Sequence, residues 1–133
     1  MSAERALIGA VRAAALADTG VQALIASRFY DEPPQDVVFP YATLGRAESR
    51  PLEASAADAL EHAVTLHVWS RHGGRAEALD VIAALRSALH NASLSITGRR
   101  LVLMFVQFTD VFRSGDGRTT HGVVRLRAVT EPQ

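Results

Sequence analysis

The stretch TDVFRSGDGRTTHGVVRLRA, residues 109–128, carries the pattern that decides the fold. Its centre is polar and rich in glycine, and Asp116-Gly117 is expected to supply the positive-φ positions of a tight reversal. Beyond it, residues 124–128 alternate between apolar and basic side chains, as in a strand with one buried face. The stretch holds no nucleophile, metal cluster or phosphate loop, so this hairpin suggests an assembly protein rather than a catalyst.

Residues 101–108, which precede the hairpin, are almost uninterrupted in apolar side chains. A strand of this composition is apolar on both faces and must be covered on both, by its own chain or by another. Two short helices are too few to cover both faces of a sheet. The segment is therefore the best indication of oligomerisation that the residues themselves contain.

Working outward, the patterns predict alternating helices and strands. Helices are expected at residues 7–14, where Ser2 serves as the cap, and at residues 78–89, with a short helical turn at residues 21–25 after Asp18 or Thr19. Strands are expected at residues 29–30, 37–44, 59–71 and 94–98, and residues 46–58 are interpreted as a long mobile loop. This order predicts a single domain, residues 1–133, of class α+β with a mainly antiparallel sheet and two helices packed on one face.

Composition narrows the possible functions. Fourteen basic and fourteen acidic residues balance, which argues against a nucleic-acid binder and does not oppose self-association. Cysteine is absent, which removes disulfide scaffolds and thiolate sites. The first residues lack a secretory pattern and no apolar run approaches the length of a membrane span, so we expect a soluble, cytoplasmic chain without a membrane partner.

Histidines provide the candidate catalytic and metal groups. His62 and His67 point to opposite faces of one strand and cannot share a metal, and His62 is expected to be a hydrogen-bonded core or boundary residue. Ser114, Asp116 and His121 have the residue types of a catalytic triad, but an exposed turn cannot hold them rigidly. We therefore expect no catalytic residue, no metal site and no cofactor.

Trp69 lies on the polar face of its predicted strand, beside His67 and Arg71. Tryptophan and arginine are enriched at the centres of protein interfaces, so Trp69 is a candidate anchor for a partner. Alternatively, a second element of the same chain covers this face and Trp69 belongs to the core. The sequence leaves both interpretations open.

Four segments together resemble the small tail-completion proteins of tailed phages and of alphaproteobacterial gene transfer agents. They are FPY at residues 39–41, EHAVTLHVWSR at 61–71, DVFR at 110–113 and DGRTTHGVVR at 116–125. The resemblance runs from the first helix to the last strand. Its most specific parts are the His-Val-Trp-Ser segment at residues 67–70 and the Asp-Gly-Arg-Thr hairpin at residues 116–119.

The resemblance implies a tail terminator, a homohexameric ring that caps the head-proximal end of the tail tube and joins it to the head–tail connector or stopper protein. DNA would pass through the channel without sequence-specific binding. The chain would assemble in the cytoplasm and then belong to the released particle. The family has no catalytic residues to transfer.

Two alternatives accompany this expectation: a head–tail stopper or adaptor ring of the same particle, or a small enzyme or ligand-binding domain. A deep pocket holding His62 or His67 would favour the enzyme, and an apolar sheet face or unpaired sheet edge would favour the ring. The residues expected at subunit or ring interfaces are Arg50, Glu53, Trp69, Arg71, Arg113, Asp116 and Arg118.

Overall fold

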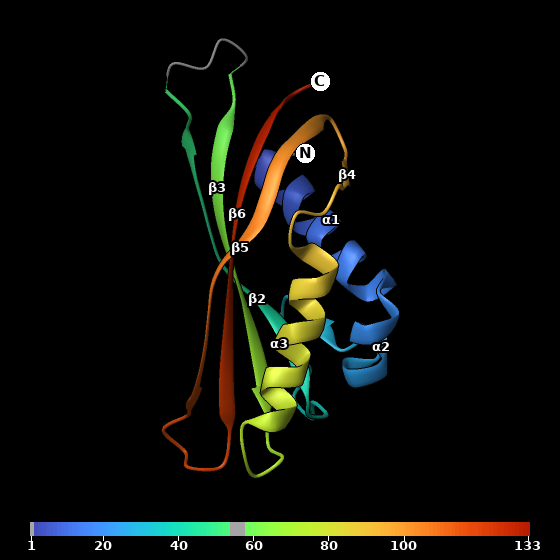
Figure 1. The fold of residues 1–133 in the computed structure, drawn as a ribbon, viewed down its shortest axis with the longest axis vertical. Helices are drawn as coiled ribbons and strands as arrows, with labels where there is room; N and C mark the ends of the chain where they lie inside the picture. Colours follow the sequence, from blue (N-terminus) through green and yellow to red (C-terminus); the bar gives the residue numbers. More distant parts are fainter. Residues whose placement is uncertain (1, 54–57) are drawn as a thin grey trace.

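The computed structural model describes residues 2–53 and 58–133. Three helices, α1 (Ala3–Ala17), α2 (Thr19–Ile25) and α3 (Ala76–Leu89), lie on one face of a sheet (Figure 1). The strands are β1 (Phe29–Tyr30), β2 (Tyr41–Pro51), β3 (Leu60–Ser70), β4 (Ser95–Ile96), β5 (Arg99–Arg113) and β6 (Thr120–Pro132). Their order across the sheet is β1-β2-β3-β6-β5-β4, antiparallel at every junction except β1 with β2. The α+β class is confirmed. The two expected helices are present, and the expected short turn at residues 21–25 is part of a third helix, α2.

Local sequence signals explain the helices. Ser2 caps α1 by accepting a hydrogen bond from the Arg5 backbone N–H at 3.0 Å, and Asp18 caps α2 by accepting one from the Gly20 N–H at 3.2 Å. The stripe predicted for α3 is fully buried, and Val81 extends it. Asn91 follows the helix in a left-handed conformation, with φ of 57°, which suits a chain reversal at this point. Among the described residues, no single helix is long and apolar enough to cross a membrane; α1 and α2 meet that criterion only as a pair bent by 84°.

Strand β3 is at the centre of the fold and matches its prediction. The residues Val64, Leu66 and Val68 are buried beneath the helices, while the intervening side chains face the other way. His62 lies on the helix-covered side, where it is buried and hydrogen-bonded. Its Nδ1 is 2.7 Å from the Ser49 Oγ and its Nε2 is 2.7 Å from the Thr130 Oγ1, so the expected core histidine is confirmed.

Strand β2 differs from the prediction at both ends. It begins at Tyr41 rather than at residue 37, and it continues to Pro51 through residues that we interpreted as a mobile loop. That interpretation is wrong for residues 46–51, while residues 54–57 lie outside the described part. The error has a physical cause. Pairing with β3 supplies the backbone hydrogen bonds of this segment, so its exposed polar side chains need no apolar alternation.

The β5–β6 hairpin forms as predicted, with one correction at its tip. Only Gly117 has a positive φ, 71°; Asp116 instead accepts hydrogen bonds from the backbone N–H groups of Arg118 and Thr119. This hairpin and the β2–β3 hairpin extend beyond the helices at opposite ends of the molecule (Figure 1). The two ends of the subunit therefore carry different hairpins with different sequences.

Candidate interaction surfaces

The face of the sheet that the helices leave open carries a row of aromatic rings. The register places Tyr41 opposite Trp69, Trp69 opposite His121, and His121 opposite Phe112. The ring centroids of Trp69 and His121 are 4.0 Å apart in a stacked arrangement, and those of Phe112 and His121 are 4.8 Å apart. Trp69 is half-buried by these neighbours, and its indole N–H donates to the Thr43 Oγ1 at 3.0 Å. Neighbouring side chains of its own sheet therefore support Trp69 laterally, and its role as an anchor for a partner stays a prediction.

His67 and His121 form a hydrogen-bonded pair within this row. The His67 Nδ1 is 2.7 Å from the His121 Nε2, so one imidazole donates the proton and the other accepts it. Burial lowers the pKa of both side chains, and the neighbouring His67 charge lowers the pKa of His121 further. Gly45 makes room for the pair, because a Cβ at that position would overlap the His67 ring.

The hairpin tip is a second polar cluster, and it contains several of the predicted interface residues. The Asp116 carboxylate accepts hydrogen bonds from the Thr119 backbone N–H at 2.8 Å and the Thr119 hydroxyl at 2.7 Å. These bonds, with a smaller effect of the Arg71 charge, lower the pKa of Asp116 to about 2. Arg71 also donates to the Thr119 Oγ1 at 3.1 Å, and lies 3.7 Å from the Asp116 carboxylate. The tip is thus tied to the end of β3.

The seven predicted interface residues fall into two groups. Trp69, Arg71, Arg113, Asp116 and Arg118 gather at the end of the molecule that carries the β5–β6 turn. Arg113 donates to the Gly117 carbonyl at 2.9 Å, and the Arg118 backbone N–H contacts Asp116. Arg50 and Glu53 are exposed on the β2–β3 hairpin at the other end. His121 bonds to His67, and Asp116 bonds to Thr119, so the residue types of a triad are not brought together.

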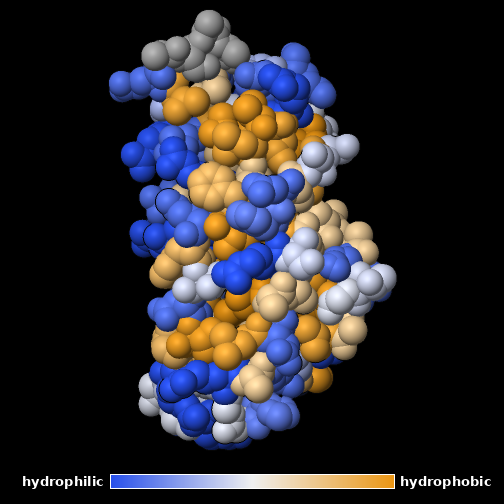
Figure 2. Space-filling model, viewed as in Figure 1, coloured by the Kyte–Doolittle hydropathy of each residue, from blue (hydrophilic) through white to orange (hydrophobic). Residues whose placement is uncertain are grey.

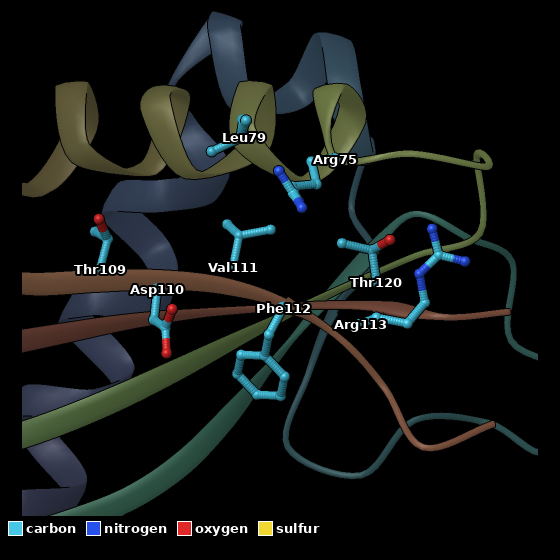
Figure 3. A pocket seen from close by; sticks show the side chains of 8 residues that line it. All are labelled: Arg75, Leu79, Thr109, Asp110, Val111, Phe112, Arg113 and Thr120. Atoms are coloured by element: carbon cyan, nitrogen blue, oxygen red, sulfur yellow. The ribbon is translucent and has the colours of Figure 1, made fainter. Parts of the chain in front are cut away.

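A third surface, a cleft of 610 Å³, separates the beginning of α3 from the lower part of β5 (Figure 3). Arg75 and Leu79 line it from α3, while Thr109 and Val111 point toward them from β5. The Asp110 and Phe112 side chains point to the opposite face of the sheet. Sequence reasoning missed this cleft. One signal was present, since Leu79 is apolar yet lies outside the buried stripe of α3.

Strand β5 also exposes apolar side chains, as its composition predicted. Val102, Leu103, Phe108 and Phe112 are all more than two-fifths exposed, whereas Met104 is buried. Figure 2 shows apolar surface near the upper end of the molecule and again near its lower end, with hydrophilic groups between. Among the described residues, β4 pairs only with Arg99 and Arg100, so residues 101–113 have no strand partner on their outer side. Apolar area of this kind on a strand edge is typical of a protein interface.

Within the described ranges, no group of three or more His, Cys, Asp or Glu side chains is arranged to hold a metal ion. The His67 and His121 imidazoles share a hydrogen bond, and within the described part of the chain no serine or carboxylate oxygen is hydrogen-bonded to either ring. The exposed apolar side chains of β5 are a surface that is available for contacts with other proteins.

Comparisons with known proteins also point to a protein that assembles with others. A family model described as tail completion protein gp17 matches residues 9–131. The tail completion protein gp17 of Bacillus phage SPP1 is 30% identical over 99 residues, which span 73% of this chain and 72% of the phage protein. A chain in the virion of a native gene transfer agent particle superposes with a TM-score of 0.90 at 26% identity, covering 98% of this chain and 99% of the other. The solved SPP1 gp17 structure gives a TM-score of 0.65 at 26% identity, covering 95% and 89%.

Proposed function

Because the chain belongs to the tail completion protein gp17 family, we propose that it is the tail terminator of a phage-like particle, acting as a hexameric ring. The ring caps the head-proximal end of the tail tube, stops its growth and joins it to the head–tail connector or stopper. Its role is structural rather than catalytic. Subunits assemble in the cytoplasm and leave the cell as part of the particle.

The observation that carries the proposal is the unlike character of the two sheet edges. One edge is formed by β1 and the outer side of β2, and the other by β5 with the two-residue β4. A contact that joins unlike surfaces is heterologous, and heterologous contacts generate rings when the rotation closes. The exposed apolar side chains of β5 provide area for such a contact. A protein with identical mating surfaces would instead form a closed dimer.

The two ends of the subunit suit two different partners. In a ring whose axis follows the strands, the β2–β3 hairpins gather on one side and the β5–β6 hairpins on the other (Figure 1). Arg50 and Glu53 then lie on one rim, and Arg71, Arg113, Asp116 and Arg118 lie on the other. We assign the tube to one rim and the connector to the other. The formal net charge of zero suits a channel that lets DNA pass without retaining it.

Reconstruction of the head–tail junction in assembled particles tests the proposal. We expect a six-fold ring of this chain directly on the upper end of the tail tube. A ring one position closer to the head would make the chain a stopper or adaptor instead. Absence from the particle, or single copies away from the axis, would contradict a terminator role.

A further inference from the structure

The loop between β1 and β2, residues 31–40 with sequence DEPPQDVVFP, has an unusual composition. It contains Asp31, Glu32 and Asp36 and no basic residue, and all three acidic side chains are exposed. Among the described residues, none of the three makes an ion pair. The loop also carries Val38, which at 60% exposure is the most solvent-accessible of the large exposed apolar side chains. It therefore presents uncompensated negative charge around an apolar group.

The cleft between α3 and β5 has the complementary character. Arg75 and Arg113 line it, and neither makes an ion pair within the part of the chain that the structure describes. The nearest carboxylate on β5, that of Asp110, points away from α3 (Figure 3). Leu79, which lines this cleft from α3, is 49% exposed. Two arginines beside an exposed leucine form a surface that an acidic, partly apolar segment fits.

The strand register places the loop and the cleft at the same level of the sheet. The loop ends at Pro40, and the next residue, Tyr41, begins the cross-strand row that runs through Trp69 and His121 to Phe112. The loop is thus at one end of that row and the cleft is at the other. In Figure 1 the loop, which follows β1 beside α2, and the beginning of α3 both lie in the lower half of the molecule. Subunits related by rotation about an axis along the strands would present one to the other without a shift in height.

We propose that the loop of residues 31–40 of one copy seats in the α3–β5 cleft of the next copy around the ring, an inference that rests on the proposed ring. The acidic side chains of the loop face Arg75 and Arg113, and Val38 contacts Leu79. The contact is heterologous, because the loop and the cleft of one subunit engage two different neighbours. The partner is a second copy of this chain.

Cysteine cross-linking tests this contact, because the natural chain contains no cysteine. The double variant Val38→Cys with Leu79→Cys is prepared as purified protein and in particles assembled in cells where it replaces the natural chain. Oxidation is expected to produce a ladder of linked subunits that ends at the hexamer, because each copy carries both halves of the contact. The matched control is Val38→Cys with Val102→Cys, since Val102, near the beginning of β5, is 45% exposed and Leu79 is 49% exposed. We expect no ladder from the control.

A charge exchange between Arg75 and Asp36 provides the second measurement, because neither side chain makes an ion pair within the described part of the chain. Arg75→Glu is expected to reduce the fraction of ring about tenfold at a fixed subunit concentration, as loss of one interfacial charge pair commonly does. Adding Asp36→Arg to that variant is expected to restore ring formation. Circular dichroism and the unfolding midpoint of the isolated subunit should be unchanged in both variants, which separates a failed contact from a failed fold.

The outcomes separate this inference from the proposed function. A six-fold ring in the particle, together with no ladder from the Leu79 pair or an equal ladder from the Val102 pair, overturns the loop-in-cleft contact and leaves the terminator role intact. Arg75→Glu without effect on ring formation also overturns the contact. Particles without any ring of this chain overturn the proposed function, and the contact with it.

Discussion

The two faces of the sheet are built from the same strands, yet they have different physical characters. On the helix-covered face, Leu66, Val68, Val124 and Leu126 are buried almost completely. On the open face, the residues next to them in sequence carry charges and rings. Glu61 pairs with Arg127 at 2.7 Å, and the Arg125 guanidinium lies 5.3 Å from the centre of the Phe108 ring.

The difference shows how one set of strands can serve two purposes. The covered face removes apolar area from water and so supplies most of the folding free energy. On the open face, side chains of neighbouring strands contact one another through an ion pair, stacked rings and the His67–His121 hydrogen bond. Such a face is compatible with water in the free subunit and remains available to other proteins in an assembly.

The largest effect is expected from truncation on the covered face. Leu126→Ala removes a side chain that is 1% exposed and leaves a cavity, so the free energy of unfolding should fall by about 2–5 kcal/mol. Urea denaturation of the isolated subunit measures the change. The matched variant Val123→Ala lies on the open face of the same strand and should cost much less. Equal losses would mean that both faces contribute equally to the core.

A smaller effect is expected from Gly45→Ala, which tests the ring row on the open face. The new methyl group would overlap the His67 ring, so the imidazole must move and its hydrogen bond with His121 is lost. We expect destabilisation of about 1–3 kcal/mol, as for other overpacked sites. Gly9→Ala is the control, because nothing lies within 4 Å of a Cβ there. Histidine side-chain NMR should show that the two imidazoles have separated; an unchanged spectrum would contradict the geometry.

The smallest effect is a dependence of stability on pH. Burial lowers the pKa values of His62, His67 and His121 in the folded chain, whereas the unfolded chain binds these protons near pH 6.5. The unfolded state then holds more protons below that pH, so stability is full above about pH 6.5 and is lost as the pH falls toward 5. The lowered pKa of Asp116, about 2, also stabilises the folded chain, and this stabilisation is lost only as the pH falls from 3.8 toward 2.

Urea midpoints at pH 7.5 and pH 5 measure this loss. Two of the three histidines are on the open face, so His67→Gln combined with His121→Gln should reduce the difference between the two midpoints. His72→Gln is the control, since the His72 side chain is exposed. A midpoint that rises on acidification would have the wrong sign for buried neutral histidines.

Elements with strong local patterns were predicted well from the sequence. The alternation in β3, the buried stripe of α3 and the turn before Thr120 depend on residues close together in the chain, and all three were confirmed. Strand β2 was misjudged because its outer half is polar and its stability comes from pairing with β3. The pairing is a tertiary contact, which local propensity does not encode.

The sequence by itself determined the types of the strongly patterned elements, the position of the hairpin turn, the apolar excess of residues 101–108 and the family resemblance, because each depends on residue order alone. Only the tertiary structure decided which strands form the sheet edges, that His67 meets His121 across 54 residues, and that Arg75 and Arg113 line one cleft. The physical reason is that these contacts depend on strand register and on helix placement. Strand register and helix placement are set by how the apolar faces of all the elements are buried together, and no single segment determines that.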